Sequence, residues 1–451
     1  MNATERSEWL GHPRGLSTLF FTEMWERFSY YGMRSLLILF MVAPAATGGL
    51  GFPTKQAASL YGFYTMGVYA LSIPGGWIAD RFLGHYRAVL YGGVLIMLGH
   101  FSMAFPSVPS FFTGLGLIVV GTGLLKPNVS TMVGLLYRPD DARRDAGFSI
   151  YYMGINLGAM IAPLVCGFLG QRVNWHLGFA AAGIGMLLGL IQYLHGSRHL
   201  ADARNSWSPR PATDGGRERP PLHSDDWRRL GLIGVFFVFA VIFWSAFEQA
   251  GSTLTLFADR HTRLSLLGFS FPSSWFQSEQ PLFVILLAPV FAWLWMRLGR
   301  REPSGPAKFA MGLLLVSAGY FLLIPAARLA STGVKVSPMW LTCAYLLHTF
   351  GELCLSPVGL RLVTKLSPRR LVGAMMGVWF LGAAIGNFIA GWIAGFSDEY
   401  PLFRIFTFNA LLTLGAAIAL ALMVRPILAV TAERGATSSR RDAGSATSTA
   451  G

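Results

Sequence analysis

Twelve apolar runs, each long enough to cross a bilayer as a helix, dominate this chain of 451 residues. Hydrophobic residues make up 53% of the chain and charged residues only 13%, so the composition excludes an ordinary soluble protein. We therefore predict an all-α polytopic membrane protein with about twelve transmembrane helices. The runs lie at 16–43, 56–80, 86–106, 110–134, 146–171, 174–196, 229–257, 277–297, 307–329, 338–366, 371–397 and 401–425.

The runs form two sets of six, separated by a short stretch rich in Arg, Pro, Asp and Gly. This stretch has no apolar period, which is typical of a linker. The sequence thus predicts two six-helix bundles and a tail whose Ser, Thr, Ala and Gly content indicates disorder. The expected boundaries are 1–197 for the first bundle, 198–228 for a cytoplasmic linker, 229–426 for the second bundle and 427–451 for a cytoplasmic tail.

Lysine and arginine gather in alternate gaps between the runs. They are frequent at the N-terminus, in the even-numbered gaps, in the linker and in the tail, and sparse in the odd-numbered gaps. By the positive-inside rule, both termini are expected in the cytoplasm, with the protein in the cell membrane. The net charge of +14 follows this pattern and forms no surface patch, so no nucleic-acid partner is expected. The three cysteines have no metal-ligand spacing, and no metal site is expected.

The first run carries charges in its interior. Counted from Glu23, the residues Glu26, Arg27 and Arg34 follow at offsets of 3, 4 and 11, which places all four on one helix face. Each charge would cost about 3 kcal/mol at the bilayer midplane, so the face must point into a wet or paired interior. An ion-pair ladder between helices is one interpretation. A site that handles protons and a charged solute is the interpretation we favour.

Other ionisable residues also lie inside runs. Lys126 and Arg361 are isolated cations that need partners. Glu352 is an isolated acid in a stripe with His348, for which a structural role or a proton relay is open. Polar and aromatic residues at helical spacing, which can be packing residues or ligands, accompany them on other helices: Tyr61, Tyr64, Tyr69, Tyr152, Asn156, Trp244, Glu248 and Ser356.

Two six-helix halves joined by a linker resemble a major-facilitator transporter. Five motifs in order then resemble the proton-dependent oligopeptide transporters within that superfamily, and the resemblance spans nearly all twelve runs. The motifs are EMWERFSYYG, which contains an ExxER signature, GTGLLKPNVS, FSIYYMGINLGA, FEQAGSTLTLFADR and GELCLSPVGL.

The resemblance implies a proton-coupled symporter that imports di- and tripeptides by alternating access. Its partners would be peptide, protons and lipid; it would be a monomer, not an enzyme, with no cofactor beyond the proton gradient. The implied proton-coupling residues are Glu23, Glu26, Arg27, Lys126 and Glu352, with Lys126 pairing with the first-helix acids and Glu352 pairing with Arg34 as a latch. The implied substrate-binding residues are Tyr30, Tyr31, Arg34, Tyr69, Lys126, Asn156, Trp244, Glu248, Gln280, Glu352, Ser356 and Trp379.

The chain departs from the family pattern where Gln280, preceded by Glu279, replaces the usual Asn before Pro281. Glutamine can make the same hydrogen bonds with a longer arm, so peptide length or side-chain preference stays open. A relative carrying nitrate, an amino acid or a peptide-like drug would share the scaffold. A membrane enzyme using Glu248, His348 and Glu352, a channel and a receptor-like sensor are the remaining alternatives.

Overall fold

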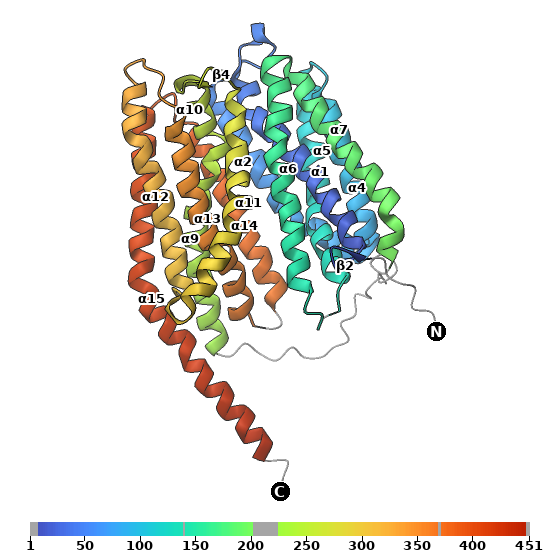
Figure 1. The fold of residues 1–451 in the computed structure, drawn as a ribbon, viewed down its shortest axis with the longest axis vertical. Helices are drawn as coiled ribbons and strands as arrows, with labels where there is room; N and C mark the ends of the chain where they lie inside the picture. The colour runs from blue at the N-terminus through green and yellow to red at the C-terminus, as the bar shows by residue number, and fades with distance from the viewer. Residues whose placement is uncertain (1–7, 139, 202–223, 369–370, 448–451) are drawn as a thin grey trace.

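The computed structural model describes residues 8–138, 140–201, 224–368 and 371–447, which form a bundle of long, roughly parallel helices (Figure 1). A short hairpin of β1 (Glu8–Trp9) and β2 (His12–Pro13) precedes the first helix. The helices of the first half are α1 (Gly15–Val42), α2 (Thr54–Ala70), α3 (Ser72–Ile78), α4 (His85–Met103), α5 (Val108–Leu135), α6 (Arg144–Arg172) and α7 (Trp175–His195), with the short turns η1 (Ala45–Thr47), η2 (Ala79–Leu83) and η3 (Gly196–Leu200).

The second half begins at α9 and contains a second hairpin, of β3 (Ser265–Leu266) and β4 (Phe269–Ser270). Its helices are α9 (Ser224–Phe247), α10 (Thr253–His261), α11 (Glu279–Leu298), α12 (Gly305–Ala330), α13 (Met339–Leu366), α14 (Val372–Ala394) and α15 (Leu402–Thr447), with the short turns η4 (Glu248–Gly251), η5 (Ser273–Ser278) and η6 (Gly299–Arg301).

Each of the twelve predicted runs coincides with helix in the described chain, and the predicted all-α fold is confirmed. Two runs are interrupted: 56–80 divides into α2, α3 and η2, and 229–257 divides into α9, η4 and α10. Eight described helical segments are long and apolar enough to span a membrane by composition alone. The segment of α1 is not among them, because its buried charges lower its hydropathy.

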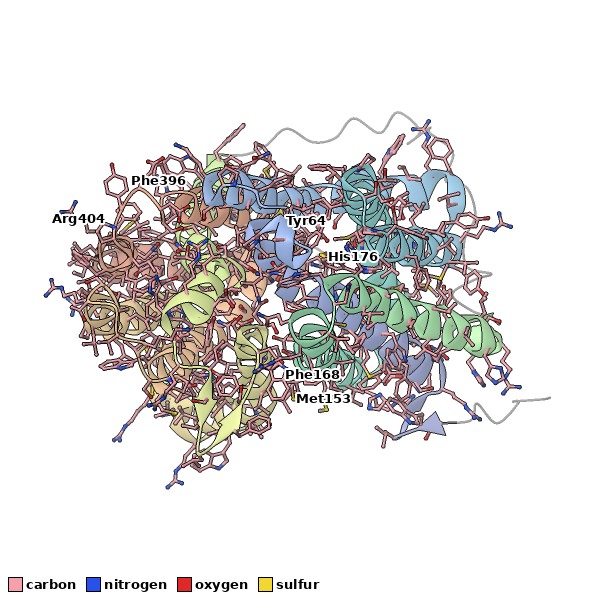
Figure 2. The ribbon with its side chains drawn as sticks, turned by 90° about the horizontal axis from the view of Figure 1, so that it is seen from above. Tyr64, Met153, Phe168, His176, Phe396 and Arg404 are labelled. Carbon is pink, nitrogen blue, oxygen red and sulfur yellow. The ribbon has the colours of Figure 1, made fainter. Side chains whose placement is uncertain are left out.

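The helices gather into two bundles that lie side by side, as the view along the bundle in Figure 2 shows. Apolar cores hold each bundle together: Phe236, Phe309 and Tyr320 are fully buried in the second half, and Phe40 and Phe179 in the first. The bundles meet where α2 packs on α14 and where α6 packs on α11 and η5. Residues from both halves can therefore line a common space.

Both chain termini leave the molecule at the same end, which we call the terminal end, while β3 and β4 lie at the opposite far end (Figure 1). At the far end Lys55 Nζ lies 2.7 Å from Glu399 Oε1, and Arg260 Nη2 donates to Thr54 Oγ1 over 3.1 Å. Gln171 on α6 adds a 2.8 Å bond from its Nε2 to Ser273 Oγ. The far end is thus tied by polar contacts between the two halves.

The end of the chain differs from the expectation of a disordered tail from residue 427. The backbone of α15 continues as helix through Pro426 to Thr447. Alanine and arginine, which favour helix, occur five and three times between residues 427 and 447, in keeping with a helical backbone despite the Ser, Thr and Gly content. The expected linker, 198–228, lies mostly outside the described residues.

Candidate functional site

The charged face of α1 is buried, as its spacing predicts. Glu23, Glu26 and Arg27 are 2%, 0% and 3% exposed. Arg27 Nε lies 2.5 Å from Glu26 Oε2 and 3.3 Å from Glu23 Oε1, and its guanidinium stacks 5.2 Å from the ring centre of Tyr30. Two carboxylates thus share one guanidinium, so this cluster can hold an additional proton or attract another cation.

Arg34, two turns further along α1, joins the two halves. Its Nη2 forms an ion pair and hydrogen bond with Glu248 Oε2 of η4, and its Nε donates to the hydroxyl of Tyr61 on α2 over 2.6 Å. Close approach requires Gly251: an added Cβ there would lie 1.8 Å from the Tyr61 oxygen and 2.9 Å from Arg34 Nη2. The break of the helix at η4 therefore lets α2 come close to the pair.

This arrangement corrects one expectation. The resemblance implied that Arg34 pairs with Glu352, but the ionic partner of Arg34 is Glu248. Glu352 forms no ion pair with a described residue, although it lines the same space. Glu248 pairs with Arg34 in place of Glu352 because Glu248 lies at the start of η4, which packs directly against α1.

Lys126 differs from its expected pairing in a similar way. Its Nζ lies 3.8 Å from the centre of the Tyr69 ring, a cation–π contact, and among the described residues it forms no ion pair with Glu23 or Glu26. Arg27 already occupies those carboxylates. The ammonium is thus held by an aromatic face and stays available to an anion.

A central cavity of about 300 Å³ lies between the halves, with Arg34 and Lys126 from the first half and, from the second, Glu248 and an acid that pairs with no described cation, Glu352. Eleven of the twelve predicted substrate-binding residues line it: Tyr31, Arg34, Tyr69, Lys126, Asn156, Trp244, Glu248, Gln280, Glu352, Ser356 and Trp379. Tyr30 is the exception, because it is buried behind Tyr31 with the two ring centres 5.3 Å apart. Glu23, Glu26 and Arg27 also lie outside the lining.

Several lining residues are not among the twelve that the resemblance implied as substrate-binding: Tyr152, which the spacing had left open as packing residue or ligand, and Phe247, Gln277, Pro281 and Phe380. Tyr152 and Gln277 had a usable signal, because each is about one helical turn from a predicted residue, Asn156 or Gln280. Phe247 and Phe380 are ordinary apolar neighbours of Glu248 and Trp379 in the sequence, so nothing marked them out.

Glu279 and Gln280, at the start of α11 where the chain departs from the family pattern, face two different cavities. Gln280 lines the central cavity, whereas Glu279 lines a separate side cavity of about 300 Å³ between α6, η5, α11 and α13. There Glu279 Oε1 accepts a 2.9 Å hydrogen bond from Thr342 Oγ1, and no described cation forms an ion pair with it. Only Gln280 is therefore placed to contact a molecule in the central cavity.

Comparison of the chain with known proteins identifies its family. A model of the POT family matches residues 86–213 and 222–409. The chain belongs to the POT family of transporters.

Two relatives and one solved structure illustrate the similarity. The peptide transporter YePEPT of Yersinia enterocolitica is 40% identical, over 93% of this chain and 95% of the relative. A di-/tripeptide transporter of Lactococcus lactis is 36% identical, over 95% of this chain and 98% of the relative. A crystal structure of a peptide transporter POT in complex with alafosfalin superposes with a TM-score of 0.88 at 38% identity, covering 94% of this chain and 97% of that one.

These findings confirm the family and the major-facilitator fold expected from the motifs. The protein is a multi-pass membrane transporter and not an enzyme. The enzyme alternative, in which His348 is a catalytic group, therefore falls. His348 is fully buried and packs on the Tyr320 ring, with the ring centres 4.9 Å apart, so it belongs to the core of the second half.

Proposed function

We propose that this POT-family protein is a proton-coupled symporter that imports di- and tripeptides by alternating access. It would act as a monomer in the cell membrane, with the terminal end in the cytoplasm. The observation that carries the proposal is the charge layout of the central cavity: Arg34 and Lys126 project from the first half, and Glu352 faces them from the second.

This layout suits a zwitterion with charges at both ends. The carboxylate of a peptide would bind near Arg34 and Lys126, and its ammonium would bind near Glu352 and the amide of Asn156. Gln280 adds an amide on the same wall. Aromatic rings from both halves, including Tyr69 and Trp379, would contact the peptide side chains and backbone without fixing their identity.

Proton coupling would act through the bond between Arg34 and Glu248. Protonating Glu248 removes the charge that holds Arg34, which frees the guanidinium for the peptide carboxylate. Glu352 and the Glu23, Glu26 and Arg27 cluster would take part as further proton sites. One proton moved with a neutral peptide carries one charge, worth about 2.3 kcal/mol per 100 mV, or roughly fiftyfold accumulation.

The test is uptake of a labelled dipeptide into liposomes that contain the purified protein, with an inward proton gradient and a potential negative inside. We expect accumulation that a protonophore abolishes and that unlabelled di- and tripeptides compete away. Glu248→Gln and Glu352→Gln should lose accumulation but keep exchange of labelled for unlabelled peptide, because exchange needs no net proton movement.

The matched control is Glu279→Gln, which alters a buried acid of the same half outside the central cavity. It should accumulate peptide like the wild type. Accumulation by Glu248→Gln at the wild-type level would exclude the proposed coupling through Arg34. Failure of any dipeptide to accumulate or compete would exclude the peptide substrate while leaving the family unaffected.

A further inference from the structure

A second cavity, of about 480 Å³, lies in the second half near the terminal end, between α9, α11, α12, α13 and α15. It shares no lining residue with the central cavity. We call it the basic cavity, because four of its lining residues are cations, Arg229, Lys308, Arg361 and Lys365, against one carboxylate, Glu302.

Two of these cations already have partners. Lys308 Nζ lies 2.5 Å from Glu302 Oε1 and 3.9 Å from the centre of the Trp295 ring, and this lysine is only 7% exposed. Arg229 Nη1 lies 3.7 Å from Asp226 Oδ1. These contacts fix the inner wall of the cavity and neutralise its one acid.

The other two cations form no ion pair with a described residue. Arg361 and Lys365 are exposed and lie one turn apart on α13, so they present two positive charges on one helix face at the rim. Arg361 is five residues from the end of α13, about 8 Å along the helix axis, within the depth of lipid headgroups. A cation at this depth calls for an anion beside it.

The remaining wall is apolar. Leu232, Leu362, Leu366 and Ile427, from three helices, line it together with the Trp295 ring. A free phosphate has no apolar part and would gain nothing from this surface. A molecule with an anionic head and a hydrocarbon chain would bury its chain there and place its head between the rim cations.

We propose that the basic cavity binds one anionic phospholipid from the bilayer leaflet at the terminal end. Its phosphate contacts Arg361 and Lys365, and the start of one acyl chain lies against Leu232 and Leu362. The bound lipid would brace α13 against α9 and α12. The helix α13 also lines the central cavity through Glu352 and Ser356, so the lipid would hold one wall of that cavity.

The experiment measures binding of phosphatidylglycerol and of phosphatidylcholine to the full-length protein in detergent, by native mass spectrometry and by the midpoint of thermal unfolding. We expect one phosphatidylglycerol to bind saturably and to raise the midpoint more than phosphatidylcholine does. Arg361→Gln with Lys365→Gln should weaken that binding roughly thirtyfold, because two surface cations are lost.

The matched control is Arg297→Gln with Arg300→Gln, which removes two cations near the same end that do not line the basic cavity. It should keep wild-type lipid binding. Should the rim double variant fail to fold, Arg361→Gln and Lys365→Gln alone provide the same comparison.

Several outcomes would overturn the proposal, among them equal binding of the two lipids, equal losses in the rim and control variants, and an equal thermal shift with inorganic phosphate alone. The last would indicate a free-anion site. Displacement of phosphatidylglycerol by an acidic peptide but not by more lipid would likewise reject a lipid occupant.

Discussion

Two buried carboxylates of the second half, Glu248 and Glu279, show how strongly the surroundings of one residue decide its role. Glu248 is bound to a buried guanidinium that belongs to the other half of the molecule. Among the described residues, Glu279 has one hydrogen-bond partner, the hydroxyl of Thr342, in a largely apolar side cavity. Removing the first acid leaves an unpaired buried charge, whereas removing the second leaves none.

We therefore predict opposite effects of two identical substitutions on stability. Glu248→Leu should lower the free energy of unfolding by about 3–5 kcal/mol, because Arg34 would stay buried without its anion. Glu279→Leu should leave stability unchanged or raise it, since Thr342 Oγ1 can still donate to Pro338 O, 3.4 Å away. Thermal unfolding in detergent measures both, and a larger loss for Glu279→Leu would contradict the assignment.

For single residues, the sequence predicted which of them line the central cavity better than it predicted which of them form ion pairs. Helical spacing placed Glu23, Glu26, Arg27 and Arg34 on one face because that pattern is local. The partner of Arg34 was not predictable, because Glu248 and Glu352 are both acids of the second half and only the packing of η4 against α1 separates them.

Among the elements, the crossing of α2 and α14 brings the backbones of the two halves into direct contact. A Cβ added at Gly391 would lie 2.5 Å from the Gly62 Cα and 2.7 Å from the Ala58 carbonyl oxygen. The rings of Phe63 and Phe388 flank the crossing, with their centres 4.9 Å apart. The two backbones touch directly at this crossing because a glycine lies on each side of it.

We expect Gly391→Val to disrupt this crossing. The added methyl groups would push α14 away from α2, lowering both the thermal midpoint in detergent and the rate of peptide uptake in liposomes. Gly415→Val on α15 is the control, because no atom lies within 4 Å of a Cβ added there. Equal uptake by the two variants would show that transport does not require close packing of α2 on α14.

Hydropathy predicted every long helix but not where two of them break. The break after Ala70 has a local cause, because Pro74 has no N–H to donate to the Ala70 carbonyl and its ring displaces that carbonyl, whereas no proline lies near the break after Phe247. Tertiary contact accounts for the second break, where η4 packs against α1. Such contacts join distant parts of the chain, so a sliding window misses them.

In the whole molecule, polar contacts tie the two halves at the far end, from Lys55 with Glu399 to Gln171 with Ser273. The two-bundle architecture itself followed from the sequence, because two sets of six runs and a polar linker leave few alternatives. The sequence could not predict which end is tied by polar contacts, because hydropathy and charge bias are the same in every conformation of a transporter.

Alternating access predicts that fixing the far end stops transport. Lys55→Cys with Glu399→Cys, in a background without the native cysteines, should lose peptide uptake when a short bis-methanethiosulfonate reagent bridges the two thiols through disulfide bonds and releases methanesulfinate. Reduction should restore uptake. The control carries Asp398→Cys alone. The reagent then has no second thiol to bridge and should have little effect on uptake. Undiminished uptake by the bridged protein would contradict an opening at the far end.

The ion pair between Lys55 and Glu399 is also among the most solvent-exposed ion pairs of the described residues, with side chains 65% and 46% exposed. An exposed pair contributes about 1 kcal/mol or less, and dissolved ions weaken it, with a Debye length near 8 Å at physiological ionic strength. The ionic strength on that side of the membrane thus shifts the balance between the two conformations. Low ionic strength favours the far-end contact, and high ionic strength favours its opening.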